Sequence, residues 1–534
     1  MNCAKPLRRW IETFVTSITT SINPIKQAVM KFNIFKRKAV AVTNYEGAKA
    51  FAMTPELELY SAVVTAGLSD SFYEKGNERL QRIVDLLEKT DAEFVAKLAV
   101  YARSKMYMRS IPQVLAVELA KRNSGNTVVS KAVNGVVQRA DEITELLAYY
   151  QLANKRAGTK KLNKLSKQVQ KGLAEAFNRF DEYQFSKYNR DAEVTLRDAL
   201  FLVHPKAKSD EQQAVFNKIA AKNLAVAYTW ETELSTLGQQ KFENDKAKAA
   251  AFRAKWEELI FSGKLGYMAL MRNLRNIIEA GVSWDAMKTV CDTLSDANAV
   301  AKSKQLPFRF LAAYREVKVL KADYVSMVLN ALEDAVVASA QNIRGFDYNT
   351  RVLIACDVSA SMQKPISAKS KVLLFDIGLM LGMLMQSKCQ RVVSGMFGDR
   401  WKVINMPNRG VLSNVDEYYK REGEVGYATN GYLVINDLIN RKVVMDKVMV
   451  FTDLQMWNNN RDGGHLQTAW KQYKQIAPMA KLYLFDLSGY GNTPISVQRD
   501  DVTLIAGWSD KVFDVLQASE NGVNAIAMIK QLEL

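Results

Sequence analysis

The chain has 534 residues, of which 48% are hydrophobic and 24% charged, so sizeable cores and two or more domains are expected. Its four cysteines have no paired spacing and no CxxC motif, which argues against a disulfide framework and fits a reducing, cytoplasmic location. With only two histidines, a His-ligated zinc site and most His-based catalysis are disfavoured. No run of eighteen apolar residues occurs, so no transmembrane helix is expected.

The formal net charge of +17 is distributed unevenly along the chain. Residues 1–350 carry +14 and residues 351–534 carry +3, which together make up the total. A strong positive field of this kind favours polyanionic partners, with nucleic acid first and an acidic membrane surface second. The basic partner surface is therefore expected in the N-terminal two thirds of the chain.

The first 40 residues form a basic extension with a single acid, Glu12. Trp10, Ile11, Phe14 and Val15 are spaced to line one face of an amphipathic helix. The segment fits a transit-like peptide, a membrane-surface helix or an RNA-binding arm. It has no signal-peptide apolar region with a cleavage site, and we favour a flexible or weakly helical arm.

Residues 41–345 read as one helix after another, without β-type alternation. Helices of three to four turns with short Gly, Asn or Ser breaks indicate an α-solenoid of HEAT type. The expected helices include Glu56–Ala66, Asn77–Lys89, Ala92–Lys105, Val114–Lys121, Val128–Arg139, Gln212–Leu224, Tyr267–Glu279 and Ala322–Ala340. We place the boundary with the next domain, residues 346–534, near Arg344–Asp347.

A lysine stripe is predicted within this helical region. No acidic residue occurs from 151 to 174, and the lysines at 160, 164, 167 and 171 are spaced to share one helix face. Leucines and a valine at similar spacing would dock the opposite face. Like charges at this spacing repel one another, so an unmixed stripe favours a polyanion over a merely solvated face. The stripe residues are Lys160, Lys164, Lys167 and Lys171.

A candidate metal site begins at the end of an apolar run, Val352–Cys356. The run reads as a buried parallel strand, and it is followed by Asp357, Ser359 and Ser361. A loop at the carboxyl end of such a strand is where open α/β sheets place their ligands. One carboxylate and two hydroxyls suit a small hard cation such as Mg²⁺. The pattern resembles the metal-ion-dependent adhesion site of von Willebrand factor A domains.

The rest of the C-terminal third fits a doubly wound α/β domain. An apolar helix is expected over Ala368–Gln386, and further strands over Arg391–Phe397, Val448–Thr452, Leu482–Phe485 and Val502–Ala506. The A-domain pattern also requires a threonine from a middle loop and an aspartate after the fourth strand. Thr429, just before a helix over Gly431–Asn440, and Asp453 fill these places.

Over nearly its whole length from about residue 42, the chain resembles the TROVE family of Ro ribonucleoproteins. Four segments carry the resemblance, in family order: Thr43–Ala48 with the following Leu-Glu-Leu-Tyr and Phe72-Tyr73-Glu74, Leu196–Lys206 ending in His-Pro-Lys, Met268–Asn276, and Pro307-Phe308-Arg309 before the A domain. The resemblance implies a ring of HEAT-type helices closed by the A domain. It further implies binding of Y-like small RNA on the outer face, of single-stranded ends of misfolded RNA in the hole, and, in bacteria, work with an exoribonuclease.

Several RNA-contact residues follow from the resemblance. It places His204 of the His-Pro-Lys segment and Lys187 on the RNA-binding outer face, with Arg190 nearby. Arg272 and Arg275 in the signature segment fit inner-ring phosphate contacts and structural helix anchors equally well. The chain departs from the family at the threonine of the metal site, where Gly-Tyr-Ala-Thr-Asn, residues 426–430, stands for the usual Gly-Gly-Thr-Asp.

Three classes of function fit these features. We prefer a monomeric RNA-binding quality-control or scaffold protein without catalytic residues. The alternative is a metal-dependent protein-interaction module that binds a partner's carboxylate through its A domain. An enzyme such as a nuclease is disfavoured, since no G-x-x-x-x-G-K-[ST], no H-E-x-x-H and no carboxylate cluster beyond the metal site occurs.

Overall fold

The computed structural model describes residues 39–534 except 67–70, 72, 156–164, 190, 341–342, 368–369, 408 and 458–464. The basic N-terminal extension therefore lies outside the described residues, and so do Lys160, Lys164 and Arg190. Residues 41–534 pack as one compact unit. Among the described residues, no helix is long and apolar enough to cross a membrane.

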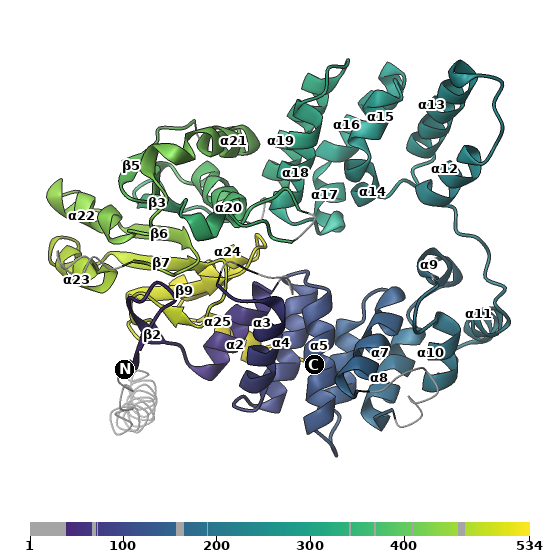
Figure 1. The fold of residues 1–534 in the computed structure, drawn as a ribbon, viewed down its shortest axis with the longest axis horizontal. Helices are drawn as coiled ribbons and strands as arrows, with labels where there is room; N and C mark the ends of the chain where they lie inside the picture. Colours follow the sequence, from purple (N-terminus) through teal and green to yellow (C-terminus); the bar gives the residue numbers. More distant parts are fainter. Residues whose placement is uncertain are drawn as a thin grey trace, which may run out of the picture. The chain divides into compact units, whose positions relative to one another are not determined.

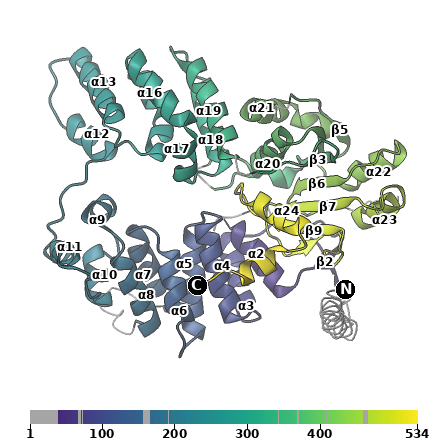
Figure 2. The ribbon, with the colours of Figure 1, turned by 180° about the vertical axis from the view of Figure 1, so that it is seen from behind.

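The helical region runs from α2 to α19 and is coloured purple to green in Figure 1. Most expected helices are present with ends shifted by a few residues. The bounds are α2 Pro55–Val64, α3 Gly76–Leu87, α4 Ala92–Ser104, α5 Ser110–Arg122, α6 Val128–Val136, α7 Asp141–Ala153, α8 Lys167–Phe177, α9 Glu182–Tyr188, α10 Leu196–Val203, α11 Asp210–Ala221, α12 Trp230–Gly238, α13 Asp245–Phe261, α14 Tyr267–Arg272, α15 Leu274–Glu279, α16 Trp284–Ser295, α17 Ala297–Ser303, α18 Pro307–Lys318 and α19 Val325–Ser339. Helices close in sequence pack against one another in stretches such as α4–α6 and α16–α19, as an α-solenoid requires, whereas an extended segment joins α11 to α12 (Figure 2).

Two predictions for this region were wrong. The helix expected over 267–279 is divided at Asn273, a buried residue whose side chain donates to the Ala269 carbonyl oxygen at 2.8 Å. The region also contains strands, β1 (Ala41–Thr43) and β2 (Lys49–Ala52). β2 pairs antiparallel with β8 (Asn492–Thr493), a partner more than 400 residues away that no local pattern reveals.

The C-terminal region is a six-stranded sheet in the order β5-β4-β3-β6-β7-β9. All neighbouring strands are parallel except the edge strand β5, which runs antiparallel to β4. The bounds are β3 Arg351–Asp357, β4 Arg391–Phe397, β5 Trp401–Val403, β6 Lys447–Thr452, β7 Lys481–Asp486 and β9 Val502–Ala506, with helices α20 Leu374–Lys388, α21 Val411–Arg421, α22 Tyr432–Asn440, α23 Leu466–Ile476, α24 Val512–Glu520 and α25 Ala525–Lys530.

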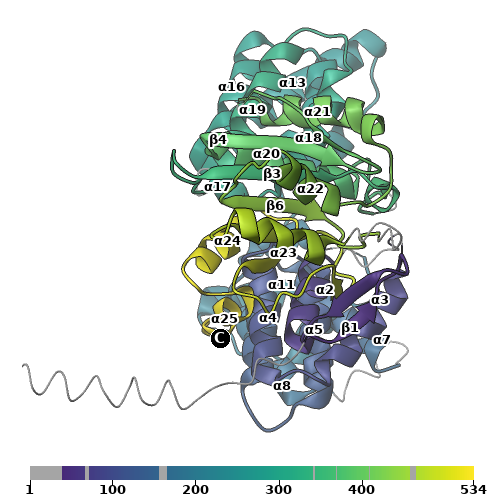
Figure 3. The same cartoon turned by 90° about the vertical axis from the view of Figure 1, so that its left-hand side faces the viewer.

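The alternation of side chains along the strands explains why helices cover both faces of this sheet. Ile354 and Phe451 belong to the core that contains α20 and α24, whereas Leu353 and Val450 belong to a second core with α22 and α23. Figure 3 shows the sheet from the side. The doubly wound α/β domain and the preceding α-solenoid are thus the fold predicted from the sequence.

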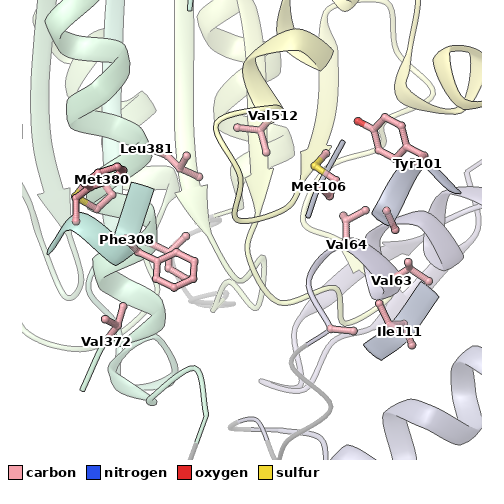
Figure 4. Packing of buried hydrophobic residues seen from close by; sticks show 14 of the residues in the cluster. Val63, Val64, Tyr101, Met106, Ile111, Phe308, Val372, Met380, Leu381 and Val512 are labelled. Carbon is pink, nitrogen blue, oxygen red and sulfur yellow. The ribbon is translucent and has the colours of Figure 1, made fainter. Parts of the chain in front are cut away.

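The larger core is continuous from the solenoid into the α/β domain. Figure 4 shows part of it, with Phe308 of α18 and Met380 of α20 on one side and Val64 of α2 on the other. Polar groups join the regions as well: Asp486, fully buried at the end of β7, accepts hydrogen bonds from Ser61 of α2 and from the Gly489 amide. The Ser61 contact holds α2 against the carboxyl edge of the sheet, and the Gly489 contact fixes the loop that follows β7.

Candidate functional site

The five residues predicted to bind a metal converge at the carboxyl edge of the sheet. Asp357 ends β3, Ser359 precedes a short 3₁₀ helix (Ala360–Gln363) and Ser361 lies within it. Thr429 precedes α22 and Asp453 follows β6. β3 and β6 are adjacent parallel strands, which brings the two acids together. All five side chains are buried. The sequence pattern therefore identified a real cluster, although its role as a metal site stays a prediction.

Hydrogen bonds fix most of this cluster. Asp357 accepts from the Thr452 hydroxyl at 2.6 Å and from the Ser359 amide at 2.9 Å. The Ser359 and Ser361 hydroxyl oxygens are 3.2 Å apart. Asp453 Oδ1 accepts from the Gln455 amide at 3.0 Å, whereas the buried Asp453 Oδ2 receives no hydrogen bond from the described residues. A buried carboxylate oxygen without a donor is costly unless a cation or a proton satisfies it.

The raised pKa values of Asp357 and Asp453 also favour a cation or a proton at this cluster. Burial raises the pKa of Asp357 to about 6. Burial, followed by the charge of Asp357, raises the pKa of Asp453 to about 7, while the Ser361 hydroxyl partly offsets the shift. Two carboxylates that repel one another in a buried site are what a divalent cation would neutralise.

A pocket of about 240 Å³ opens above the two serines and Thr429. Its wall includes Tyr427 and Trp457, together with Glu46 from the turn between β1 and β2 and Tyr73 from the connection between α2 and α3. The available ligand atoms are all oxygens, as Mg²⁺ prefers. Among the described residues, no cluster of three or more His, Cys, Asp or Glu side chains has the arrangement of a metal site, so a cation here would depend on two acids and on hydroxyls.

Hydrogen bonds hold the backbone of the loop that contains Thr429, residues 426–430. The Ala360 amide donates to the Tyr427 carbonyl oxygen at 3.0 Å, which ties this loop to the serine loop. The Thr429 carbonyl oxygen accepts from the Trp457 amide at 3.0 Å. Asn430, which replaces the usual acid, is buried, and among the described residues its Oδ1 atom has no donor.

The predicted lysine stripe is only partly a feature of one helix. α8 begins at Lys167, because Ser166 has extended backbone and donates its amide to the Tyr150 hydroxyl at 3.2 Å. The prediction of one continuous helix from Lys160 to Lys171 was therefore wrong. Lys167 and Lys171 are exposed on α8, opposite the buried Val169 and Leu173, as the pattern predicts.

The helical region also contains a cavity of about 830 Å³ that sequence reasoning missed. It brings together Lys187 and Arg272, two of the predicted RNA contacts from α9 and α14. Arg139 and Lys264 add two further cations, and the aromatic side chains are Tyr183, Tyr188, Tyr228, Trp230 and Tyr267. The aromatic residues are scattered over 85 positions of sequence, so only the fold assembles them.

Cations and rings already lie against one another in this cavity. The Arg139 guanidinium carbon is 4.3 Å from the centre of the Tyr188 ring, and Lys264 Nζ is 5.0 Å from that of Tyr228. Lys187 Nζ lies 5.8 Å from the Tyr183 ring centre. The cavity therefore combines positive charge with aromatic surface, the two features that bind single-stranded nucleic acid.

Of the predicted RNA contacts that the structure describes, Lys167, Lys171, His204 and Arg275 do not line this cavity. His204 is exposed and ends α10 in a left-handed conformation, with φ of 49°. Arg275 is exposed and pairs with Glu279 at 2.9 Å, one helical turn along α15. Of the two signature arginines, only Arg272 lines the cavity, which separates two residues that the sequence could not distinguish.

The profile of the TROVE domain family matches residues 62–253 and 224–344, which together span just over half of the chain. Telomerase protein component 1 of Mus musculus is 23% identical over 308 residues, covering 45% of this chain and 12% of that protein. The Rattus norvegicus protein of the same name is 22% identical over 309 residues, covering 46% and 12%. The chain thus spans only a small part of the length of these relatives.

A similar fold occurs in the crystal structure of the Deinococcus radiodurans RO (RSR) protein. The TM-score is 0.57 at 18% sequence identity, and the match covers 88% of this chain and 100% of that one. The likeness therefore extends across both the helical region and the α/β domain.

Proposed function

The chain belongs to the TROVE domain family, and from this we propose that it is an RNA-binding ribonucleoprotein component. The observation that carries the proposal is the cavity in which Lys187, Arg272 and the neighbouring tyrosines meet. Aromatic faces stack on unpaired bases irrespective of sequence, and the cations neutralise the phosphates beside them. Single-stranded RNA is therefore the ligand that this cavity suits. The single-stranded ends of misfolded RNA are the proposed source of that ligand.

A second RNA surface is proposed outside the cavity. Lys167 and Lys171 on α8 and the exposed His204 lie apart from the aromatic cavity and fit a structured, Y-like small RNA contacted mainly at its phosphates. An exoribonuclease that acts on RNA held by the protein is a further proposed partner, and the cytoplasm the proposed location.

Replacement of Lys187 and Arg272 by glutamine is expected to weaken binding of single-stranded RNA. Removal of each cation that neutralises a phosphate should lower the slope of log affinity against log salt by about 0.7. Fluorescence anisotropy with a labelled single strand over a range of KCl concentrations measures both quantities. R275Q is the matched control for R272Q, because Arg275 is three residues away but does not line the cavity. Equal losses of affinity in the two variants would contradict the assignment.

We also propose that Asp357, Ser359, Ser361, Thr429 and Asp453 hold one divalent cation, Mg²⁺ by preference. The specific support is the buried, unsatisfied Asp453 Oδ2 beside a second carboxylate. A bound cation would supply a positive charge at the pocket floor for a carboxylate ligand. This supports a second candidate function, in which the α/β domain acts as a metal-dependent module for binding a protein partner.

RNA cleavage by the chain itself is not expected. The residues that line the metal pocket and those that line the aromatic cavity share no member, so the proposed RNA site and the proposed cation site are separate. Incubation of purified protein with single-stranded and structured RNA in Mg²⁺ or Mn²⁺ should leave both intact on a denaturing gel. Cleavage that disappears in D357A would place the protein among the enzymes.

A further inference from the structure

The turn between β1 and β2 brings an acid to the mouth of the metal pocket. Glu46 lies in this turn and lines the pocket together with Ser359, Ser361 and Thr429. Glu46 is exposed, so its carboxylate remains accessible to water. None of the sequence patterns for the metal site includes this residue, which lies more than 300 positions before Asp357.

The backbone of this turn is anchored on the metal-site loop. The Asn44 side-chain amide donates to the Met456 carbonyl oxygen at 2.7 Å, and the Tyr45 amide donates to Gln455 Oε1 at 3.0 Å. The backbone amide of Gln455 in turn donates to Asp453 Oδ1 at 3.0 Å. One residue thus links the turn carrying Glu46 to the acid beneath the pocket.

Tyr73 holds the Glu46 side chain over the site. Its hydroxyl donates a hydrogen bond to Glu46 Oε1, and its ring stacks on Tyr45 with centres 5.3 Å apart. Burial raises the pKa of Tyr73, with further contributions from Glu46 and Asp453, whereas the Ser361 hydroxyl lowers it. The Tyr73 hydroxyl therefore lies within electrostatic reach of both Glu46 and the metal cluster.

We propose that Glu46 is an intramolecular carboxylate ligand for the cation site. From the pocket wall its carboxylate would close onto the cation at the position that a partner's carboxylate would take, and an external carboxylate binds only when Glu46 withdraws. A tethered group competes at an effective concentration in the millimolar range, so free carboxylates below that concentration are excluded. The inference rests on the proposed metal site. It implies that an acidic partner binds the α/β domain only if its carboxylate displaces Glu46 from the cation.

The test compares E46Q with the wild-type chain, using Mn²⁺ as the probe and acetate as the external carboxylate. Loss of one ligand is expected to lower Mn²⁺ affinity about tenfold, measured by calorimetry and by the electron paramagnetic resonance signal of free Mn²⁺. Acetate should restore the affinity of E46Q and leave that of the wild type unchanged. E243Q, which removes an exposed acid outside the pocket, should bind Mn²⁺ as the wild type does.

The control for the metal site itself is D453A, which should abolish Mn²⁺ binding. If wild type and E46Q bind Mn²⁺ equally and respond alike to acetate, while D453A binds none, the role of Glu46 is overturned and the metal site stands. If the wild type binds Mn²⁺ no better than D453A does, the proposed metal site and the proposed role of Glu46 are both overturned. Because Glu46 is exposed, E46Q should keep the wild-type melting temperature without metal.

Discussion

Arg315→Ala is expected to lower the free energy of unfolding by about 3–5 kcal/mol, because it leaves a buried charge unpaired. The Arg315 guanidinium of α18 donates two hydrogen bonds, of 2.8 and 2.7 Å, to the two carboxylate oxygens of Asp376. Asp376 is completely buried in the first turn of α20. The pair joins the solenoid to the α/β domain, and urea unfolding followed by circular dichroism measures its contribution.

An exposed ion pair across the same junction provides the matched control. Lys371 contacts Glu316 at 2.6 Å, but the Lys371 side chain is 84% exposed. K371A should therefore change the free energy of unfolding by less than about 1 kcal/mol. If R315A cost no more than K371A, the buried pair would not be what holds α18 against α20.

The secondary structure was predictable wherever a pattern was local and long. The strands Arg391–Phe397 and Val502–Ala506 have the predicted ends, because short, mainly apolar runs rich in β-branched residues between polar turns leave few alternatives. The gathering of Asp357 and Asp453 was predictable too, since both follow buried parallel strands and such strands end at one edge of the sheet.

What the sequence concealed depends on contacts between distant residues. The pairing of β2 with β8 spans more than 400 positions, and so do the hydrogen bonds from Asn44 and Tyr45 that hold the turn carrying Glu46 at the metal pocket. The aromatic cavity has the same origin, because Tyr183, Trp230 and Tyr267 lie on different helices and have no common spacing. For the lysine stripe, the continuous helix was the part that was wrong: α8 begins only at Lys167, after Ser166, whose amide donates to the Tyr150 hydroxyl.

Mg²⁺ is expected to raise the melting temperature strongly above pH 7 and hardly at all at pH 5. The ordinary pKa of aspartate is 3.8, whereas burial raises the pKa of Asp357 to about 6 and that of Asp453 to about 7. Between pH 4 and 7 the folded, metal-free protein therefore holds protons that the unfolded chain has released. Its stability must fall as the pH rises through this window, by on the order of several kcal/mol for the pair.

Asp453→Asn separates this effect from the other titrating groups, which include Asp486, an acid whose pKa burial also raises. The neutral amide cannot ionise and no longer repels Asp357, so the metal-free variant should lose less stability than the wild type between pH 4 and 7. The same change removes a ligand charge, so Mg²⁺ should no longer stabilise the variant at pH 8. Differential scanning fluorimetry with EDTA or Mg²⁺ at pH 5, 6, 7 and 8 measures both changes. A Mg²⁺-induced shift that is equal at all four pH values, or that persists in D453N, would show that the cation acts elsewhere.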